Sequence, residues 1–458
     1  MNIFSLIRQQ AESQPDQVAY HNFNDPAGPL TYRELVAKAE AFARRLRARG
    51  VRPGERHGLY LDEGSDFLVT ALGLLAAGVC MVPMGTFLPG TEVDYIVAAA
   101  GLHALHTNRK AGGFRKAGAP TIDNHGDQEF RAACPAYIRF TSGTTGRRKG
   151  VLLSHQTIFD RLGAADQILR ITPRDRVWFQ LPMADHFVVS VLLYLSRGAT
   201  ILTASSQTDE TWRALAETHA PTLIYGSPAF YRELNASPVA ALPEVRLAIS
   251  TTSLLPQKVQ HDFRSRFGRW LNVALGIIEV GLLTLDQMHA RPGSVGTIMP
   301  AYQVTIVGAD GRPVPAGELG ELHVAGPGLL DAYLNPWRPR RRLLGEHGFP
   351  TGDFARLDSE RNLYLAGRGR SRVTVDGLVF FYEEVEAVLD ALPGIAESRV
   401  YLDKASGKLG AQLVYEAGAT GLKRIEPSLF PDLRMAPAFL TAVNSLTRTT
   451  NGKLSRAE

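Results

Sequence analysis

The sequence has little cysteine, no long apolar run and no marked excess of one charge. Only Cys80 and Cys134 are cysteines among the 458 residues, so we expect a reducing compartment and no disulfide framework. The most apolar run, residues 69–83, is interrupted by glycine and is too short to span a bilayer. Residues 1–17 include early acidic residues and lack the apolar core of a signal peptide. We therefore predict a cytoplasmic protein without membrane insertion.

The near balance of charge narrows the range of partners. The chain has 50 Lys and Arg against 45 Asp and Glu, a net charge of +5 at pH 7. This excess is too weak to predict a nucleic-acid partner, although it suits acidic partners such as nucleotides, coenzyme A or an acidic carrier protein. The apolar fraction of 45% is ordinary for a globular protein, and the length allows one large domain and a small one.

Helical and extended patterns alternate through the first half of the chain. Thr31 and Glu34 form a capping-box pattern at the start of an amphipathic helical stretch, 31–50, and residues 67–77 have the pattern of a buried helix. Short strand patterns lie at 56–61, 79–83, 104–107, 136–140, 151–153, 177–181, 200–203 and 222–226. This alternation predicts an α/β fold with largely parallel sheets and helices.

The pattern changes near residue 293. Strand patterns separated by glycine turns predict a small β-rich subdomain over about 293–367. A last block combines a helical pattern at 383–389 with strand patterns at 397–402 and 412–415. We therefore predict a large N-terminal domain, 1–367, followed by a small α+β C-terminal domain, 368–458.

Residues 141–150, TSGTTGRRKG, combine glycine, hydroxyl and basic residues between two strand patterns. Glycines let backbone amides approach an anion closely, and the hydroxyls and the basic tail add donors and charge. The combination suits a polyphosphate, although such a loop is more often a plain surface turn, and its spacing differs from that of the common P-loop. The candidate phosphate-binding residues are Thr141, Ser142, Gly143, Thr144, Thr145, Gly146 and Lys149.

Four further motifs follow this stretch in a characteristic order. They are LGIIEVG at 275–281, PTGDFARLD at 350–358, LAGRGR at 365–370 and TRTTNGKLSR at 447–456. In this order the five motifs resemble those of the adenylate-forming enzymes, which include acyl-CoA synthetases, aryl acid ligases, carrier-loading adenylation domains and luciferases. The resemblance covers essentially the whole chain. It implies that the protein uses ATP and Mg²⁺, and that the C-terminal domain is a mobile lid.

The resemblance also implies roles for single residues. Glu279 would coordinate a Mg²⁺ that bridges the ATP phosphates, with Thr144 as a second ligand, and Gly276 would lie beside the nucleotide. Asp353 and Arg368 would bind the ribose, with Arg368 also reaching toward a phosphate. Taken alone, Glu279 is more typical of a solvated turn carboxylate, and the Gly-Asp pair that includes Asp353 is typical of an ordinary turn.

A lysine near the C-terminus would take part in the chemistry. Lys453 would bridge the carboxylate of the acid substrate and the α-phosphate, although a lone lysine there is normally a solvated surface residue. The implied reaction is attack of the carboxylate on the α-phosphorus of ATP, which yields acyl-AMP and pyrophosphate. The acyl group would then pass to a thiol of coenzyme A or of a carrier-protein phosphopantetheine.

A separate group of residues is expected to form the pocket for a small carboxylic acid. His186, which we also regard as a catalytic candidate, and Phe187 match a His/Phe pair that lines the acyl pocket in the family. The other candidates are Val189, Tyr225, Gly226 and Thr251. An apolar wall of this kind favours an aryl or aliphatic acid, although the same residues are also typical of core packing. Asp185 leaves open the recognition of an α-amine.

The chain departs from the family pattern at several positions. Leu275 and Ile278 replace the usual Tyr and Thr of the second motif, and Arg370 replaces Asp or Lys at the hinge. On the loop that approaches the acceptor, Thr374 stands where Lys is usual and Val379 where Arg is usual. Residues 251–253, Thr-Thr-Ser, replace two glycines and a small residue beside the adenine, where we expect Thr252 to contact the nucleotide.

These departures leave two alternatives open. The uncharged residues 374 and 379 are compatible with an amine acceptor, which would make the product an amide rather than a thioester. The changes in the second motif and at 251–253 are compatible with a degenerate nucleotide-binding protein that has lost catalysis.

Overall fold

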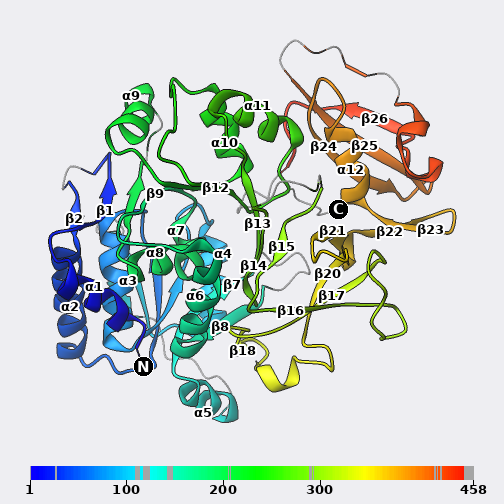
Figure 1. Ribbon diagram of the computed structural model, residues 1–458. Helices are drawn as coiled ribbons and strands as arrows, with labels where there is room; N and C mark the ends of the chain where they lie inside the picture. The colour runs from blue at the N-terminus through cyan, green and yellow to red at the C-terminus, as the bar shows by residue number, and fades with distance from the viewer. Residues whose placement is uncertain are drawn as a thin grey trace.

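The computed structural model describes residues 2–25, 28–108, 114–116, 124–141, 148–204, 206, 208–287, 291, 293–416, 419, 421–422 and 425–447. Two large sheets with helices form most of it, and smaller sheets follow toward the C-terminus (Figure 1). The predicted α/β fold with a large N-terminal part and a smaller C-terminal part is therefore confirmed.

One large sheet is parallel in its centre and antiparallel at its edges. Its spatial order in the described residues is β15 (Thr297–Ile298), β14 (Gly281–Leu285), β13 (Asn272–Ile277), β12 (Leu247–Ser250), β11 (Leu223–Gly226), β9 (Arg176–Gln180), β10 (Thr200–Thr203), β1 (Val18–Asn22) and β2 (Leu30–Thr31). Neighbouring strands from β13 to β1 are parallel, whereas β14, β15 and β2 run antiparallel to their neighbours.

The second large sheet has the same arrangement. Its central strands are parallel, and its edges are antiparallel hairpins. The order in the described residues is β19 (Arg338–Pro339), β18 (Ala332–Tyr333), β8 (Gly150–Ser154), β7 (Pro135–Phe140), β4 (Cys80–Pro83), β3 (Arg56–Tyr60), β5 (Ala104–Thr107) and β6 (Phe114–Lys116). Strands β18 and β19 come from the range predicted as the β-rich subdomain, yet they extend this sheet.

Helices surround the two sheets and bury their apolar faces. The predicted capping box is present, because the Glu34 amide donates to Thr31 Oγ1 at 3.2 Å and the Thr31 amide donates to Glu34 Oε2 at 2.9 Å. One apolar core contains residues of both sheets and of α2, α3, α6 and α8. The helices are α1 (Phe4–Ser13), α2 (Tyr32–Ala48), α3 (Ser65–Ala77), α4 (Gly90–Ala100), α5 (Asn124–Ala132), α6 (His155–Leu169), α7 (Met183–His186), η2 (Phe187–Val191), α8 (Leu192–Ser196), α9 (Asp209–Arg213), η3 (Ala214–Thr218), α10 (Pro228–Ala236) and α11 (Gln257–Phe267). No helix in the described part of the chain is long and apolar enough to cross a bilayer.

Strands dominate the chain beyond residue 300. An antiparallel sheet lies in the range predicted as the β-rich subdomain and consists of β16 (Gln303–Val307), β17 (Gly320–Ala325), β20 (Phe349–Leu357) and β21 (Leu363–Arg368). A short helix, η4 (Arg340–Arg342), lies between β19 and β20. The C-terminal elements, orange to red in Figure 1, have an apolar cluster of their own. They are η5 (Gly369–Ser371), β22 (Arg372–Val375), β23 (Leu378–Phe381), α12 (Tyr382–Asp390), β24 (Ile395–Asp403), β25 (Lys408–Tyr415), η6 (Pro427–Leu429), η7 (Leu433–Met435) and β26 (Phe439–Ala442). The domain boundary at 367–368 stays a prediction.

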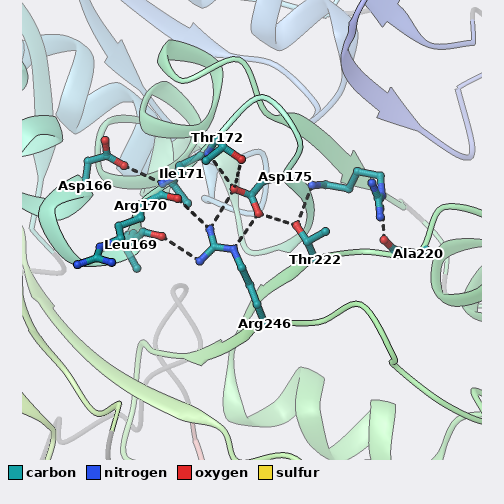
Figure 2. A network of polar contacts seen from close by, with 10 residues as sticks. Asp166, Leu169, Arg170, Ile171, Thr172, Asp175, Ala220, Thr222 and Arg246 are labelled. Atoms are coloured by element: carbon teal, nitrogen blue, oxygen red, sulfur yellow. Dashed lines mark hydrogen bonds and ion pairs between the residues drawn. The ribbon is translucent and has the colours of Figure 1, made fainter.

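A buried carboxylate joins the amino ends of three parallel strands, β9, β11 and β12 (Figure 2). Asp175, 3% exposed, accepts hydrogen bonds from Arg246 at 2.9 and 3.0 Å, from Thr222 Oγ1 at 2.7 Å and from the Thr172 amide at 2.8 Å. Burial by itself would raise the pKa of Asp175, but these bonds and the Arg246 charge outweigh it and hold the pKa below its usual value. The network therefore ties the amino ends of the three strands together.

Candidate functional site

The two ends of the glycine-rich stretch are held together at the end of the β7–β8 hairpin. The Thr141 amide donates to the Lys149 carbonyl at 2.9 Å, and the Lys149 amide donates to Thr141 Oγ1 at 3.2 Å. These bonds fix the neck of the loop. The other candidate phosphate residues lie outside the described residues, as does Lys453, so their roles stay predictions: Ser142, Gly143, Thr144, Thr145 and Gly146.

Glu279 lies in the tight turn between β13 and β14 and is held from two directions. Its Oε1 accepts a hydrogen bond from the Tyr333 hydroxyl at 2.9 Å, and its carbonyl accepts one from the Leu330 amide at 2.8 Å. Gly276, on β13 just before this turn, is exposed. The carboxylate is therefore fixed in direction at the surface of the turn.

Tyr333 also contacts the phosphate stretch. The Lys149 Nζ atom lies 4.9 Å from the centre of the Tyr333 ring, which is a cation–π distance. Burial, the nearby Glu279 charge and the hydrogen bond to it raise the pKa of Tyr333, so its hydroxyl remains a donor at neutral pH. We did not identify Tyr333 from the sequence, because it meets both motifs only through the pairing of β18 with β8.

A buried arginine lies next to the Glu279 turn, and it was also not predicted from the sequence. Arg161 on α6 is 3% exposed, and its Nε donates to the Gly328 carbonyl at 2.6 Å. Its two terminal nitrogens have no hydrogen-bond partner among the described residues. Burial lowers the pKa of Arg161 to about 10, partly opposed by Glu279 and Asp331, so the group is charged at neutral pH. A Cβ at Gly328 would lie 2.5 Å from Arg161 Cγ, so glycine is required there.

Asp353 and Arg368, the two candidate ribose residues, lie opposite each other on β20 and β21. The Arg368 Nε donates to Asp353 Oδ1 at 2.9 Å. Asp353 is buried, whereas the Arg368 side chain is 47% exposed. The structure therefore brings this predicted pair together at one edge of the small sheet.

The candidate acid-pocket residues lie at the carboxyl ends of β11 and β12 and beside them. The Thr251 amide donates to the Gly226 carbonyl at 3.1 Å, which joins the two strand ends. The His186 ring, at the end of α7, meets the Tyr225 ring edge-on with 6.0 Å between centres. Phe187, by contrast, is fully buried and packs against Phe67 of α3, as expected of a core residue.

A small cavity of about 20 Å³ adjoins these strand ends. Three of the predicted site residues, Val189, Tyr225 and Gly276, contribute to its wall. The remaining lining residues are Leu169, Tyr194, Ile249 and Leu282. The cavity thus joins the predicted acid pocket to the motif that carries Glu279, and its lining is mostly apolar.

Asp185, the residue that left α-amine recognition open, already has a cationic partner. Arg139 Nη2 lies 3.1 Å from Asp185 Oδ1, and the same guanidinium donates to the Asp185 carbonyl. Both side chains are about four-fifths buried, at 22% and 18% exposed. The Asp185 charge is therefore neutralised within the chain.

A profile of the family described as AMP-binding enzyme matches residues 7–334. This chain belongs to the AMP-binding enzyme family. The match covers both large sheets except β19, includes the glycine-rich stretch and the Glu279 turn, and ends just after Tyr333.

Relatives of this AMP-binding enzyme have different products. Phosphinothricin tripeptide synthetase PhsC of Streptomyces viridochromogenes is 28% identical over 99% of this chain, which spans 44% of that protein's length. Feruloyl-CoA synthase of an Amycolatopsis species is 26% identical over 94% of this chain and 93% of its own. The amide bond synthetase McbA of Marinactinospora thermotolerans has the same fold, with a TM-score of 0.83, 21% identity and coverage of 99% and 98%.

Two of the departures in this AMP-binding enzyme have visible physical consequences. Leu275 and Ile278 pack against the main apolar core, so their apolar side chains are accommodated. Thr252 is exposed and has a φ of +82°, in the left-handed region that β-branched residues rarely adopt. The backbone there keeps a conformation suited to glycine although the residue is threonine.

Proposed function

We propose that this AMP-binding enzyme activates a carboxylic acid with ATP, forming acyl-AMP and releasing pyrophosphate. The observation that supports the proposal most strongly is that Lys149 and Glu279 both contact the side chain of Tyr333. A cation and a carboxylate that can hold a metal thus lie together beside the neck of the phosphate loop. Asp353 and Arg368 add a polar pair suited to ribose hydroxyls.

The residues of the chain fit a Mg²⁺–ATP complex. Mg²⁺ is commonly held by one or two carboxylates together with substrate phosphates and water, so the single carboxylate Glu279 is sufficient. The described residues contain no group of three or more His, Cys, Asp or Glu that could form a separate metal site. When bound, Mg²⁺ would neutralise phosphate charge. Lys149 and the loop amides would share that task, and Thr144 is a further candidate ligand.

The reaction needs positioning and charge neutralisation more than covalent help from the protein. An oxygen of the substrate carboxylate forms a bond to the α-phosphorus, and the bond from that phosphorus to the oxygen shared with the β-phosphate breaks. Lys149 would hold the departing pyrophosphate. Lys453 would bridge the incoming carboxylate and the α-phosphate, and would move away with residues 368–458 when this lid rotates before the second step.

We assign the acid to the aryl or aliphatic class. The side chains of Val189 and Tyr225 support this class, because they offer little to pair with a charged substrate group. The ion pair between Asp185 and Arg139 also argues against recognition of an α-amine by Asp185. His186, Val189, Thr251 and Gly226 would border the acid, and Phe187 would support this wall from the core.

We propose a thiol of coenzyme A or of a carrier-protein phosphopantetheine as the acceptor, in line with the names of the feruloyl-CoA and tripeptide synthetases. One observation favours an amine instead. Thr374 and Val379 are direct cross-strand partners on the β22–β23 hairpin, and Val379 is 42% exposed. The hairpin therefore presents an uncharged pair where the family has Lys and Arg, and the amide bond synthetase shares the fold.

Pyrophosphate release over a panel of carboxylic acids, with ATP and Mg²⁺, tests the first step. At least one acid should support release, and Lys453→Ala should reduce that rate by about 100-fold or more. Release that is unchanged in Lys453→Ala across the panel would contradict the mechanism. Detection of any acyl-AMP would exclude a degenerate nucleotide-binding protein.

The acceptor requires a second experiment. The preformed acyl-AMP complex is supplied separately with coenzyme A, a phosphopantetheinylated carrier protein and free amines, and the products are identified by mass spectrometry. A thioester would support the thiol acceptor and rule out the amide. An amide, with no thioester formed, would support the alternative.

A further inference from the structure

Tyr333 is the point where two motifs far apart in the sequence meet. Its hydroxyl donates to Glu279 Oε1 at 2.9 Å, while its ring lies 4.9 Å from Lys149 Nζ. The side chain is buried, at 8% exposed, so both contacts have limited freedom. One aromatic side chain thus orients a carboxylate through its polar end and an ammonium through its face.

The backbone around Tyr333 is fixed by the strand that follows the phosphate loop. Tyr333 on β18 pairs with Val151 on β8, and the Leu334 amide donates to the Gly150 carbonyl at 2.8 Å. Residue 150 directly follows Lys149. A shift of Tyr333 along β8 would therefore break main-chain hydrogen bonds next to the loop.

The segment that precedes Tyr333 is also held. The Leu330 amide binds the Glu279 carbonyl, and Arg161 binds the Gly328 carbonyl at 2.6 Å. Arg340 donates to the Leu330 carbonyl at 2.8 Å and to Asp331 Oδ1 at 2.9 Å. Residues 328–333 therefore form a rigid strap across the Glu279 turn, and Tyr333 is the end of the strap that reaches Lys149.

We propose that Tyr333 is a positioning residue that sets the Glu279 carboxylate for Mg²⁺ and the Lys149 ammonium for the phosphates, an inference that rests on the proposed use of ATP. The hydroxyl holds one carboxylate oxygen and leaves the carboxylate pointing in one direction. The ring restrains a long, flexible lysine side chain near the loop. Neither contact requires Tyr333 to touch the reacting atoms.

The hydroxyl and the ring can be separated by substitution. Tyr333→Phe keeps the ring below Lys149 and removes the hydrogen bond to Glu279, whereas Tyr333→Leu removes both. Tyr302→Phe is a matched control, because the Tyr302 hydroxyl is also buried and donates to the carbonyl of Val280, next to Glu279, at 3.2 Å.

The test measures ATP binding by isothermal titration calorimetry without the acid, once with Mg²⁺ and once with EDTA. Tyr333→Phe should raise the Kd for ATP about fivefold to tenfold with Mg²⁺ and leave the EDTA value within about twofold. Tyr333→Leu should raise the Kd about twofold to fivefold in EDTA as well, because the lysine is no longer restrained. Tyr302→Phe should match the wild type in both conditions.

Two results would overturn the inference. One is a Kd for ATP in the presence of Mg²⁺ that is the same in Tyr333→Phe as in the wild type. The other is a Kd for ATP that rises as much in Tyr302→Phe as in Tyr333→Phe, which would indicate general destabilisation. Melting temperatures check that each variant folds, and if Tyr333→Leu does not, the two Phe variants decide the question. A wild type that binds no ATP in either condition would refute the proposed function and this inference together. A wild type that binds ATP and releases pyrophosphate, beside an unaffected Tyr333→Phe, would refute this inference alone.

Discussion

The hairpin β20–β21 carries two carboxylates for which we expect opposite consequences on substitution. Asp353 is buried, pairs with Arg368 and is our candidate for the ribose hydroxyls. Asp358, at the other end of the hairpin, accepts hydrogen bonds from the Glu360 amide at 3.0 Å, the Asn362 amide at 2.8 Å and the Asn362 side chain at 2.9 Å. One carboxylate should therefore act on nucleotide binding and the other on folding.

The expected rise in the KM for ATP on Asp353→Asn follows from the hydrogen bonds that the carboxylate loses. Asp353→Asn removes the negative charge and one acceptor oxygen, so at least one charge-assisted bond to a ribose hydroxyl is lost. Such a bond contributes about 1.5–3 kcal/mol, which corresponds to an increase in the KM for ATP of about 10- to 150-fold. The folded state loses less, because the Arg368 side chain is 47% exposed and ion pairs of that kind contribute about 0–1 kcal/mol.

The assay is initial-rate pyrophosphate release at saturating acid and Mg²⁺, with ATP varied, and a thermal melt of each variant. Asp353→Asn should change the KM for ATP strongly and the melting temperature little. Asp358→Ala should lower the melting temperature, because the bonds that close the turn are lost, and should leave the KM for ATP within about threefold.

Two results for the KM for ATP would contradict the ribose role of Asp353. If Asp353→Asn keeps a KM for ATP within threefold of the wild type, Asp353 does not bind the ribose. If Asp358→Ala raises that KM as much as Asp353→Asn does, the effect belongs to the hairpin as a whole and gives no support to a ribose contact.

Three further predictions concern the Asp175 network in Figure 2, the left-handed backbone at Thr252 and the small cavity beside Val189. Asp175→Asn should lower the free energy of unfolding by about 1–3 kcal/mol at pH 7. Because the folded-state pKa of Asp175 is lowered, its contribution to stability is present above the unfolded pKa and is lost as pH falls through the folded pKa. The urea midpoints of the wild type and of Asp175→Asn should therefore converge below about pH 4. A difference between the two midpoints that stays constant with pH would contradict this. Thr252→Gly should raise the free energy of unfolding by about 0.5–1 kcal/mol, because it relieves a φ of +82°, and a loss of stability in urea would refute strain there. Val189→Ala should enlarge the cavity and shift kcat/KM about tenfold toward bulkier acids, and an unchanged ranking of acids would show that Val189 does not border the substrate.

Much of the architecture could be predicted because it depends on local patterns. The capping box at Thr31 and Glu34 and the strand at 200–203 were expected from neighbouring residues and are present in the structure. The positions of β18 and β19 were not, because two-residue strands carry almost no periodic signal. Strand β18 pairs with β8 from far along the chain, and β19 pairs with β18. The same reason explains why residues 332–339 extend a large sheet instead of the small one.

The motif order, the α/β class and the candidate residues could all be predicted from the sequence, because they depend on residue type and spacing along the chain. Which of these residues meet depends on the packing of distant segments. Asp353 and Arg368 are opposed through a strand register, and Asp185 is neutralised by Arg139 of a distant strand. Tyr333 joins Lys149 to Glu279 because strand pairing and a buried strap bring three separate segments together, and no local pattern encodes such a contact.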